Sequence, residues 1–69
     1  MANIFAQKKA ELELTVNEAN GAVQLTIRTL WSDGSTSKRV VQSRYLDNVT
    51  PITDQVAAVF TASYAAANA

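Results

Sequence analysis

Hydrophobic and polar residues alternate strictly from Ala10 to Val16, in the order Ala-Glu-Leu-Glu-Leu-Thr-Val. This period of two predicts a β-strand, because successive side chains of a strand point to opposite faces of a sheet. One face then carries Ala10, Leu12, Leu14 and Val16, and the other carries Glu11, Glu13 and Thr15. The pattern therefore predicts a half-buried strand with its apolar face on the core.

The dipeptide Asn20-Gly21 predicts that the chain reverses after this strand. Both residues tolerate the positive φ of a type I′ turn, and a two-residue loop here pairs residues whose numbers sum to 41. The expected pairs are Val16 with Leu25, Leu14 with Ile27, Ala10 with Trp31, Thr15 with Thr26, Asn17 with Gln24, and Glu13 with Arg28. Apolar residues then face apolar residues and an acid faces a base, which favours this register.

Asp33-Gly34 predicts a second reversal, followed by a third strand over 37–45. A two-residue loop would place Ile27 opposite Val40 but Arg28 opposite Arg39, a like-charge pair that destabilises a sheet. A three-residue loop would place Ile27 opposite Val41 and avoid that pair. We slightly favour the three-residue loop, with a bulge nearby, and leave the two registers open.

A helix is predicted from about Pro51 to about Ala66. Thr50 can cap its start, Pro51 suits the first helical position, and Asp54 lies near the positive end of the helix dipole. The spacing that places residues on one face of a helix is found at Ile52, Val56, Val59, Phe60, Ser63 and Ala67. Alanine is abundant to the end of the chain and is the best helix former.

These elements predict a single α+β domain over residues 1–69: a three-stranded antiparallel meander over 10–46, with one C-terminal helix over 51–66 on its apolar face (β-β-β-α). The opposite face should meet solvent or a partner, with Glu13, Thr15, Thr26, Arg28 and either Lys38 or Arg39. The segment 1–9 is either a loose arm or an extension of the first strand.

Composition bounds what such a domain can do. The 69 residues are 48% hydrophobic and 17% charged, which favours a packed fold, but the length is near the limit for a single core. Cysteine and histidine are absent, which excludes disulfides, thiol or imidazole catalysis and zinc-finger ligand sets. We expect no metal or cofactor, and we favour self-association as the source of added stability. Neither a secretory leader nor a membrane span is recognisable, so we expect a cytoplasmic protein.

Two acidic patterns could suggest chemistry. The run Asp33-Gly-Ser-Thr-Ser matches part of a metal-dependent adhesion site, and Glu11 and Glu13 share one face of a strand. The first is better explained as a turn rich in small polar residues. The second needs a cleft to separate the two pKa values, which an open sheet face does not offer. We therefore expect a protein that is not an enzyme.

The basic residues form the other candidate site. Six basic and six acidic residues cancel, yet residues 21–46 carry a net charge of +3. The candidate interaction surface comprises Arg28, Lys38, Arg39, Arg44, Trp31, Tyr45 and Tyr64. Basic and aromatic side chains on a hairpin could bind nucleic acid, but a pI of about 6.1 argues against it. Core packing is favoured for Trp31, and a subunit contact is a reasonable role for Tyr64.

The segment Lys38-Arg39-Val40-Val41, then Asn48-Val-Thr-Pro-Ile-Thr-Asp-Gln55 and an Ala/Val-rich helix, resembles small uncharacterised proteins of Gram-positive bacteria, a family of unknown function. Those proteins place a hairpin before a Val-x-Pro-x-x-Thr-Asp helix start. The likeness covers about residues 38–66. This chain departs from the family pattern in its added strand and in its lack of a leucine-rich helix end. The resemblance implies a hairpin-plus-helix fold and a bacterial or phage origin.

Together these observations predict a small non-enzymatic protein that acts by self-association, as a dimer or higher homo-oligomer, or by binding another protein. A nucleic-acid-binding module that uses the second hairpin is the alternative. A third hypothesis is an anion site at the amide-rich helix start, Thr50–Thr53.

Overall fold

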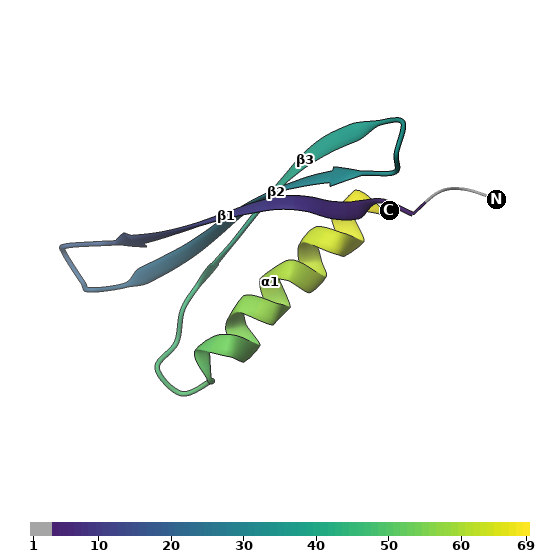
Figure 1. Ribbon diagram of the computed structural model, residues 1–69. Helices are drawn as coiled ribbons and strands as arrows, with labels where there is room; N and C mark the ends of the chain where they lie inside the picture. The colour runs from purple at the N-terminus through teal and green to yellow at the C-terminus, as the bar shows by residue number, and fades with distance from the viewer. Residues whose placement is uncertain (1–3) are drawn as a thin grey trace.

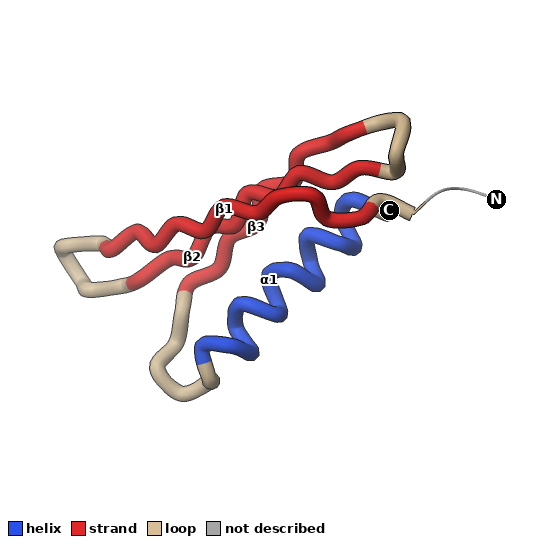
Figure 2. Tube along the Cα trace, in the orientation of Figure 1, coloured by secondary structure: helices blue, strands red, loops and turns tan. Residues whose placement is uncertain are grey.

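The computed structural model describes residues 4–69 and confirms the predicted α+β arrangement. Three antiparallel strands in the order β1-β2-β3 are followed by one helix. The elements are β1 (Ala6–Val16), β2 (Val23–Ser32), β3 (Ser37–Tyr45) and α1 (Ile52–Ala67). The helix lies on one face of the sheet and crosses it diagonally (Figure 1). The other face of the sheet is open (Figure 2).

β1 includes part of the N-terminal segment that the sequence left undecided. Ala6–Lys9 extends the strand, and residues 1–3 of that segment lie outside the described residues. The pairing with β2 shifts by one residue between Gln7 and Lys9, which is a β-bulge. The bulge falls in the first hairpin, whereas we expected one near the second.

The predicted register of the first hairpin is wrong by two residues. Val16 pairs with Val23, Leu14 with Leu25, Leu12 with Ile27, Glu11 with Arg28, Glu13 with Thr26 and Thr15 with Gln24, while Ala10 pairs with Thr29 and Trp31 lies opposite Gln7. The loop therefore has six residues rather than two. A shift of two preserves which face each side chain takes, so the predicted faces are correct although every predicted pair is not.

The loop itself explains the error. Gly21 takes the expected positive φ, +73°, but Asn20 does not, so no type I′ turn forms. Instead the Gly21 amide donates a hydrogen bond to the Asn17 carbonyl at 2.7 Å, which closes an α-turn, a single turn of helical geometry. The side-chain oxygen of Asn17 accepts a hydrogen bond from the Ala19 amide, and that of Asn20 accepts one from the Ala22 amide, each at 2.9 Å. These asparagine bonds stabilise a longer loop than the dipeptide alone predicts.

Neither register considered for the second hairpin is observed. Ile27 pairs with Gln42 and Arg28 with Val41, with a four-residue loop between the strands and no bulge in the pairing. The Asp33 carboxylate accepts the amides of Ser35 and Thr36 in this loop. The register still avoids the like-charge pair, because Arg39 lies opposite Leu30.

The start of α1 also differs from the prediction. Helical geometry begins at Ile52 and ends at Ala67, with Pro51 as the N-cap residue and without a side-chain cap. Thr50 does not cap the helix, because its hydroxyl donates to the Asp47 carboxylate at 3.2 Å. That carboxylate also accepts the amides of Val49 and Thr50, so Asp47 organises the turn before the helix. Asp54 lies in the first turn, as expected.

The buried face of α1 consists of Gln55, Val59, Ser63 and Ala67, with Val56 and Phe60 packed beside it. Ile52, which we placed on this face, is 54% exposed. Gln55 takes the buried place because its side chain donates to the carbonyls of Asp47 and Thr50 and accepts the Asp47 amide. Its three bonds offset the free energy lost when the amide leaves water.

The core joins the middle of β2 to this helix face. Leu25, Ile27 and Val59 form the buried cluster. Trp31 is 4% exposed, and its indole N–H donates to the Ser63 hydroxyl at 2.9 Å, which fixes the end of β2 to the helix. Core packing, the favoured role of Trp31, is confirmed.

Candidate interaction surface

The clearest unpartnered apolar surface lies on β1. Leu12, Leu14 and Val16, which we name the β1 stripe, share the helix-side face of the sheet and are 54%, 61% and 58% exposed. Their cross-strand neighbours Ile27 and Leu25 are buried. The sequence predicted the correct face for the stripe, but it wrongly implied that this face is covered along its whole length.

The position of α1 leaves the stripe uncovered. The helix packs mainly on β3 and β2. Its C-terminal end alone comes near β1, at the beginning of that strand (Figure 1). There the Asn68 side chain accepts the Phe5 amide at 2.8 Å and donates to the Phe5 carbonyl at 3.2 Å. Toward its other end β1 is no longer under the helix. β3 still pairs with β2 there, with Ile27 opposite Gln42 and Leu25 opposite Arg44, so the stripe lies on a three-stranded part of the sheet that the helix does not cover.

The backbone of the stripe residues is also unpaired on one side. The Asn17 amide donates to the Ala22 carbonyl, so from Lys9 onward, beyond the bulge, the odd-numbered residues of β1 turn their backbone groups toward β2. The N–H and C=O groups of Ala10, Leu12, Leu14 and Val16 therefore point away from the sheet. The described residues include no strand beyond β1, and this edge is free to pair with another chain.

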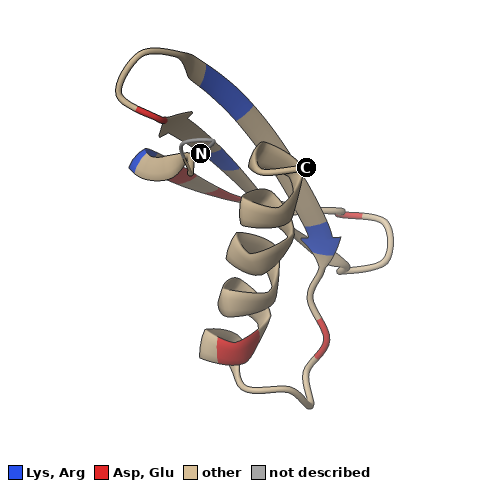
Figure 3. Cartoon of the chain, turned by 90° about the vertical axis from the view of Figure 1, so that its right-hand side faces the viewer, with Lys and Arg blue, Asp and Glu red and all other residues tan. Residues whose placement is uncertain are grey.

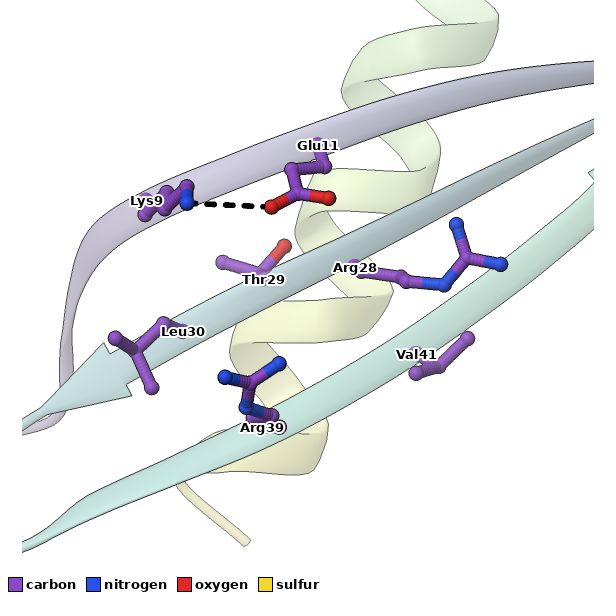
Figure 4. A pocket seen from close by; sticks show the side chains of 7 residues that line it. All are labelled: Lys9, Glu11, Arg28, Thr29, Leu30, Arg39 and Val41. Carbon is purple, nitrogen blue, oxygen red and sulfur yellow. Dashed lines mark ion pairs between the residues drawn. The ribbon is translucent and has the colours of Figure 1, made fainter.

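The open face of the sheet carries a charged hollow of about 130 Å³ (Figure 4). It is lined by Lys9, Glu11, Arg28, Thr29, Leu30, Arg39 and Val41. Lys9 and Glu11 form an ion pair at 3.3 Å, and Arg28 pairs with Glu13 at 3.1 Å, diagonally across the strands. Such exposed pairs contribute little to stability, and they agree with the interpretation of Glu11 and Glu13 as a solvated face.

The four cations of the candidate surface do not lie on one face. Strand alternation places Arg28 and Arg39 on the open face, whereas Lys38 and Arg44 lie on the helix side. Lys38 lies 4.2 Å from the centre of the Phe5 ring, and Arg44 lies 3.7 Å from the Asp47 carboxylate. Basic and acidic segments are interspersed along the chain (Figure 3). The sequence left open whether Lys38 or Arg39 lies on the open face, and the residue found there is Arg39.

The aromatic members of that surface are separated as well. Tyr45 is 67% exposed on the open face at the end of β3. Tyr64 is 46% exposed and packs edge-on against Trp31, with ring centres 5.8 Å apart and planes at 72°. Tyr64 therefore lies at the surface near the C-terminal end of α1, and its role as a subunit contact stays a prediction.

The amides before the helix start are already engaged, which bears on the anion hypothesis for Thr50–Thr53. Their hydrogen bonds, first that of Thr50 and then that of Val49, hold the pKa of the Asp47 carboxyl below its ordinary value. The amides of Thr36 and Ser35 lower the pKa of Asp33 in the same way. The chain thus supplies its own anion at each of these turns.

Among residues 4–69, no three carboxylates gather closely enough to hold a metal ion. The helix of this region is too short and not apolar enough to cross a membrane.

Comparisons with protein-family models, curated proteins and solved structures give no match to this chain. The resemblance to hairpin-plus-helix proteins of Gram-positive bacteria stays an expectation from the sequence.

Proposed function

We propose that this chain is a non-enzymatic protein that works by associating with copies of itself through the β1 stripe. The observation that carries the proposal is the exposure of Leu12, Leu14 and Val16 on the face that should be buried. Three neighbouring aliphatic side chains on one strand form a contiguous apolar patch, and such patches mark interaction sites. Burying the part of each leucine side chain that is still exposed would add about 1–2 kcal/mol.

The small core supports the same proposal. Among residues 4–69, the buried apolar residues are Leu25, Ile27, Trp31, Val59 and Ala67. The radius of gyration is 13.8 Å, against about 11 Å for a compact domain of this length. The accessible area is 4891 Å², against roughly 4,200 Å² for a compact monomer of this mass. The excess is similar to the roughly 800 Å² that each partner buries in a standard interface.

Sedimentation of the protein at micromolar concentration tests the proposal. We expect a dimer or higher assembly, with a melting temperature that rises with protein concentration. Leu14→Glu should raise the dissociation constant about a hundredfold or more, because a dimer loses two buried leucines. The control is Val49→Glu, which places the same charge on an apolar loop residue that is 87% exposed and lies outside the stripe.

A monomer at about 100 µM, with a melting temperature independent of concentration, would overturn the proposal. Equal weakening by Leu14→Glu and Val49→Glu would show that added charge, rather than the β1 stripe, controls association.

A further inference from the structure

The β1 stripe and the outer face of α1 are complementary surfaces: we infer that two copies associate face to face, with the helix of each copy covering the β1 stripe of the other. The inference rests on the proposed self-association and adds which surface of the second copy buries the stripe. The outer face of α1 is defined as Ala57, Thr61, Tyr64 and Ala65, all of them exposed.

The outer face of α1 has the composition of a covered surface. A helix that packs on one side only normally carries charged residues on its solvent side. The single charge in α1 is Asp54, in the first turn, and the chain has no charged side chain from Gln55 to Ala69. Figure 3 shows the helix free of charge beyond its start. A helix without a charged face is typically covered on more than one side.

This outer face is directed away from the helix's own sheet. Ala57, Thr61 and Ala65 each follow a buried residue of α1 by two positions. Two positions correspond to about 200° around a helix of 3.6 residues per turn. Tyr64 lies beside them and is 46% exposed. The sheet of the same copy therefore cannot cover these side chains, whereas a neighbouring copy can.

The β1 stripe needs a cover that lies above the sheet. α1 buries Leu25 and Ile27 in this way but leaves their neighbours Leu12, Leu14 and Val16 exposed. A strand added at the edge of β1 would lie beside these side chains, in the plane of the sheet, rather than over them. A helix laid on the sheet face would bury them, because helix-on-sheet packing is how apolar sheet faces are covered in α+β folds.

The space above the stripe lies on the side of α1 that faces β1. On its other side, Ala58 and Ala62 line a hollow together with Gln42, Ser43 and Arg44 of β3. Figure 1 shows the C-terminal part of β1 projecting beyond the helix. A second helix over this part of β1 would therefore lie beside α1, at about the 8–10 Å that separates packed helices.

Two-fold symmetry satisfies both surfaces at once. When two copies face each other with their helix sides, the two helices lie side by side between the two sheets. Each helix then rests on β2 and β3 of its own sheet and contacts β1 of the other sheet, so the interface is self-complementary. The excess of accessible area over that of a compact monomer is of the size that one partner buries in such an interface.

Because the chain has no cysteine, single cysteine variants can report which surfaces meet without background. Leu14→Cys marks the stripe and Ala57→Cys marks the outer face of α1. The two variants are mixed in equal amounts at micromolar concentration and treated with a short bis-maleimide cross-linker, whose length tolerates an offset of one helical turn. Mass spectrometry separates the mixed dimer from the two like dimers.

We expect the mixed dimer to exceed either like dimer about tenfold or more, because thiols held together in a complex react at an effective concentration far above micromolar. A dominant Leu14→Cys dimer, in a protein that sediments as an assembly, would overturn the inference but not the self-association. A dominant Ala57→Cys dimer, or the three dimers in statistical proportion, would overturn it likewise. A monomer in sedimentation would overturn both.

A charge on the helix gives an independent readout. Ala57→Glu should raise the dissociation constant about tenfold or more, because the dimer would bury two unpaired carboxylates. Glutamate is a good helix former, so the fold of each copy should persist. Thr15→Glu is the matched control, since it adds the same charge to β1 on the open face of the sheet. Equal effects of the two variants, or no effect of Ala57→Glu, would contradict the covering of the stripe by α1.

Discussion

The helix covers one of the two outer strands of the sheet, β3, and leaves the other, β1, largely uncovered. On β3 the helix-side residues are Lys38, Val40, Gln42 and Arg44, mostly polar, and all are half-buried. On β1 the corresponding residues Leu12, Leu14 and Val16 are apolar, and all are exposed. The helix therefore covers the more polar edge and leaves the more apolar edge open.

This inversion shows that the chain connection, as well as hydrophobicity, positions the helix. Six residues join β3 to α1, so the helix must start beside the end of β3. Gln55 and Asp47 fix that start, and the Trp31–Ser63 bond fixes the helix over β2. The apolar surface of β1 is therefore left uncovered by the helix.

The largest expected effect separates the covered strand from the open one. Ile27 is fully buried, so Ile27→Ala should reduce the free energy of unfolding by about 2–5 kcal/mol at every protein concentration. Leu14→Ala removes a side chain that is 61% exposed, and its effect should grow as protein concentration rises. Urea unfolding at two concentrations measures both. Loss of the same size at both concentrations for Leu14→Ala would mean that the stripe serves the monomer alone.

The helix anchor on β2 should give the next largest effect. Ser63→Ala leaves the buried Trp31 indole N–H without its acceptor, which should cost about 1–3 kcal/mol. Fluorescence of Trp31, the single tryptophan, reports the unfolding transition. Thr61→Ala is the control, since its exposed hydroxyl bonds only to the Ala57 carbonyl in the same helix. Equal losses in the two variants would show that the indole bond contributes little to positioning the helix.

The loop between β1 and β2 provides a smaller test. Gly21 has φ of +73° and open space around its Cα, so Gly21→Val strains only the backbone. We expect a loss of about 1–3 kcal/mol, because a β-branched residue resists this conformation. Gly21→Asn should lose less, since asparagine enters this region more readily. Thermal unfolding compares them, and unchanged stability of Gly21→Val would mean that the loop can be rebuilt freely.

The connection that positions the helix should show the smallest effect, and only at low pH. The folded-state pKa of Asp47 is lowered, so its contribution to stability is present above the ordinary range near pH 4 and is lost as pH falls through the folded value. Asp47→Asn should therefore flatten the decline of stability below about pH 4. Asp33→Asn should act likewise through the β2–β3 loop. Parallel pH curves for the wild type and both variants would contradict the assignment.

Period and parity explain which parts of the fold were predictable. Alternation in β1 identifies its faces, and an error of two residues in register leaves those faces unchanged. The register itself depends on Asn17 and Asn20, whose side-chain bonds to the loop backbone are not visible as a periodic pattern.

The helix face and the interaction surface were harder to predict for a different reason. Gln55 is buried only because its polar atoms find three backbone partners in the preceding turn. The exposure of Leu12, Leu14 and Val16 depends on the diagonal position of the helix, which local propensity does not determine. Their apolar character was plain from the sequence, but their lack of cover was not.

The two hydrogen bonds between Phe5 and Asn68 have a consequence for the order in which the chain folds. Each strand pairs with its neighbour in sequence and the helix follows β3, so every element packs on a segment that is close to it along the chain. The Phe5–Asn68 contact joins residues 63 apart in sequence and closes nearly the whole chain into a loop. Closing so long a loop is entropically expensive until the meander and helix have shortened the distance. This clasp should therefore form last and open first, and the Phe5 amide should exchange its hydrogen well before those of the central strand.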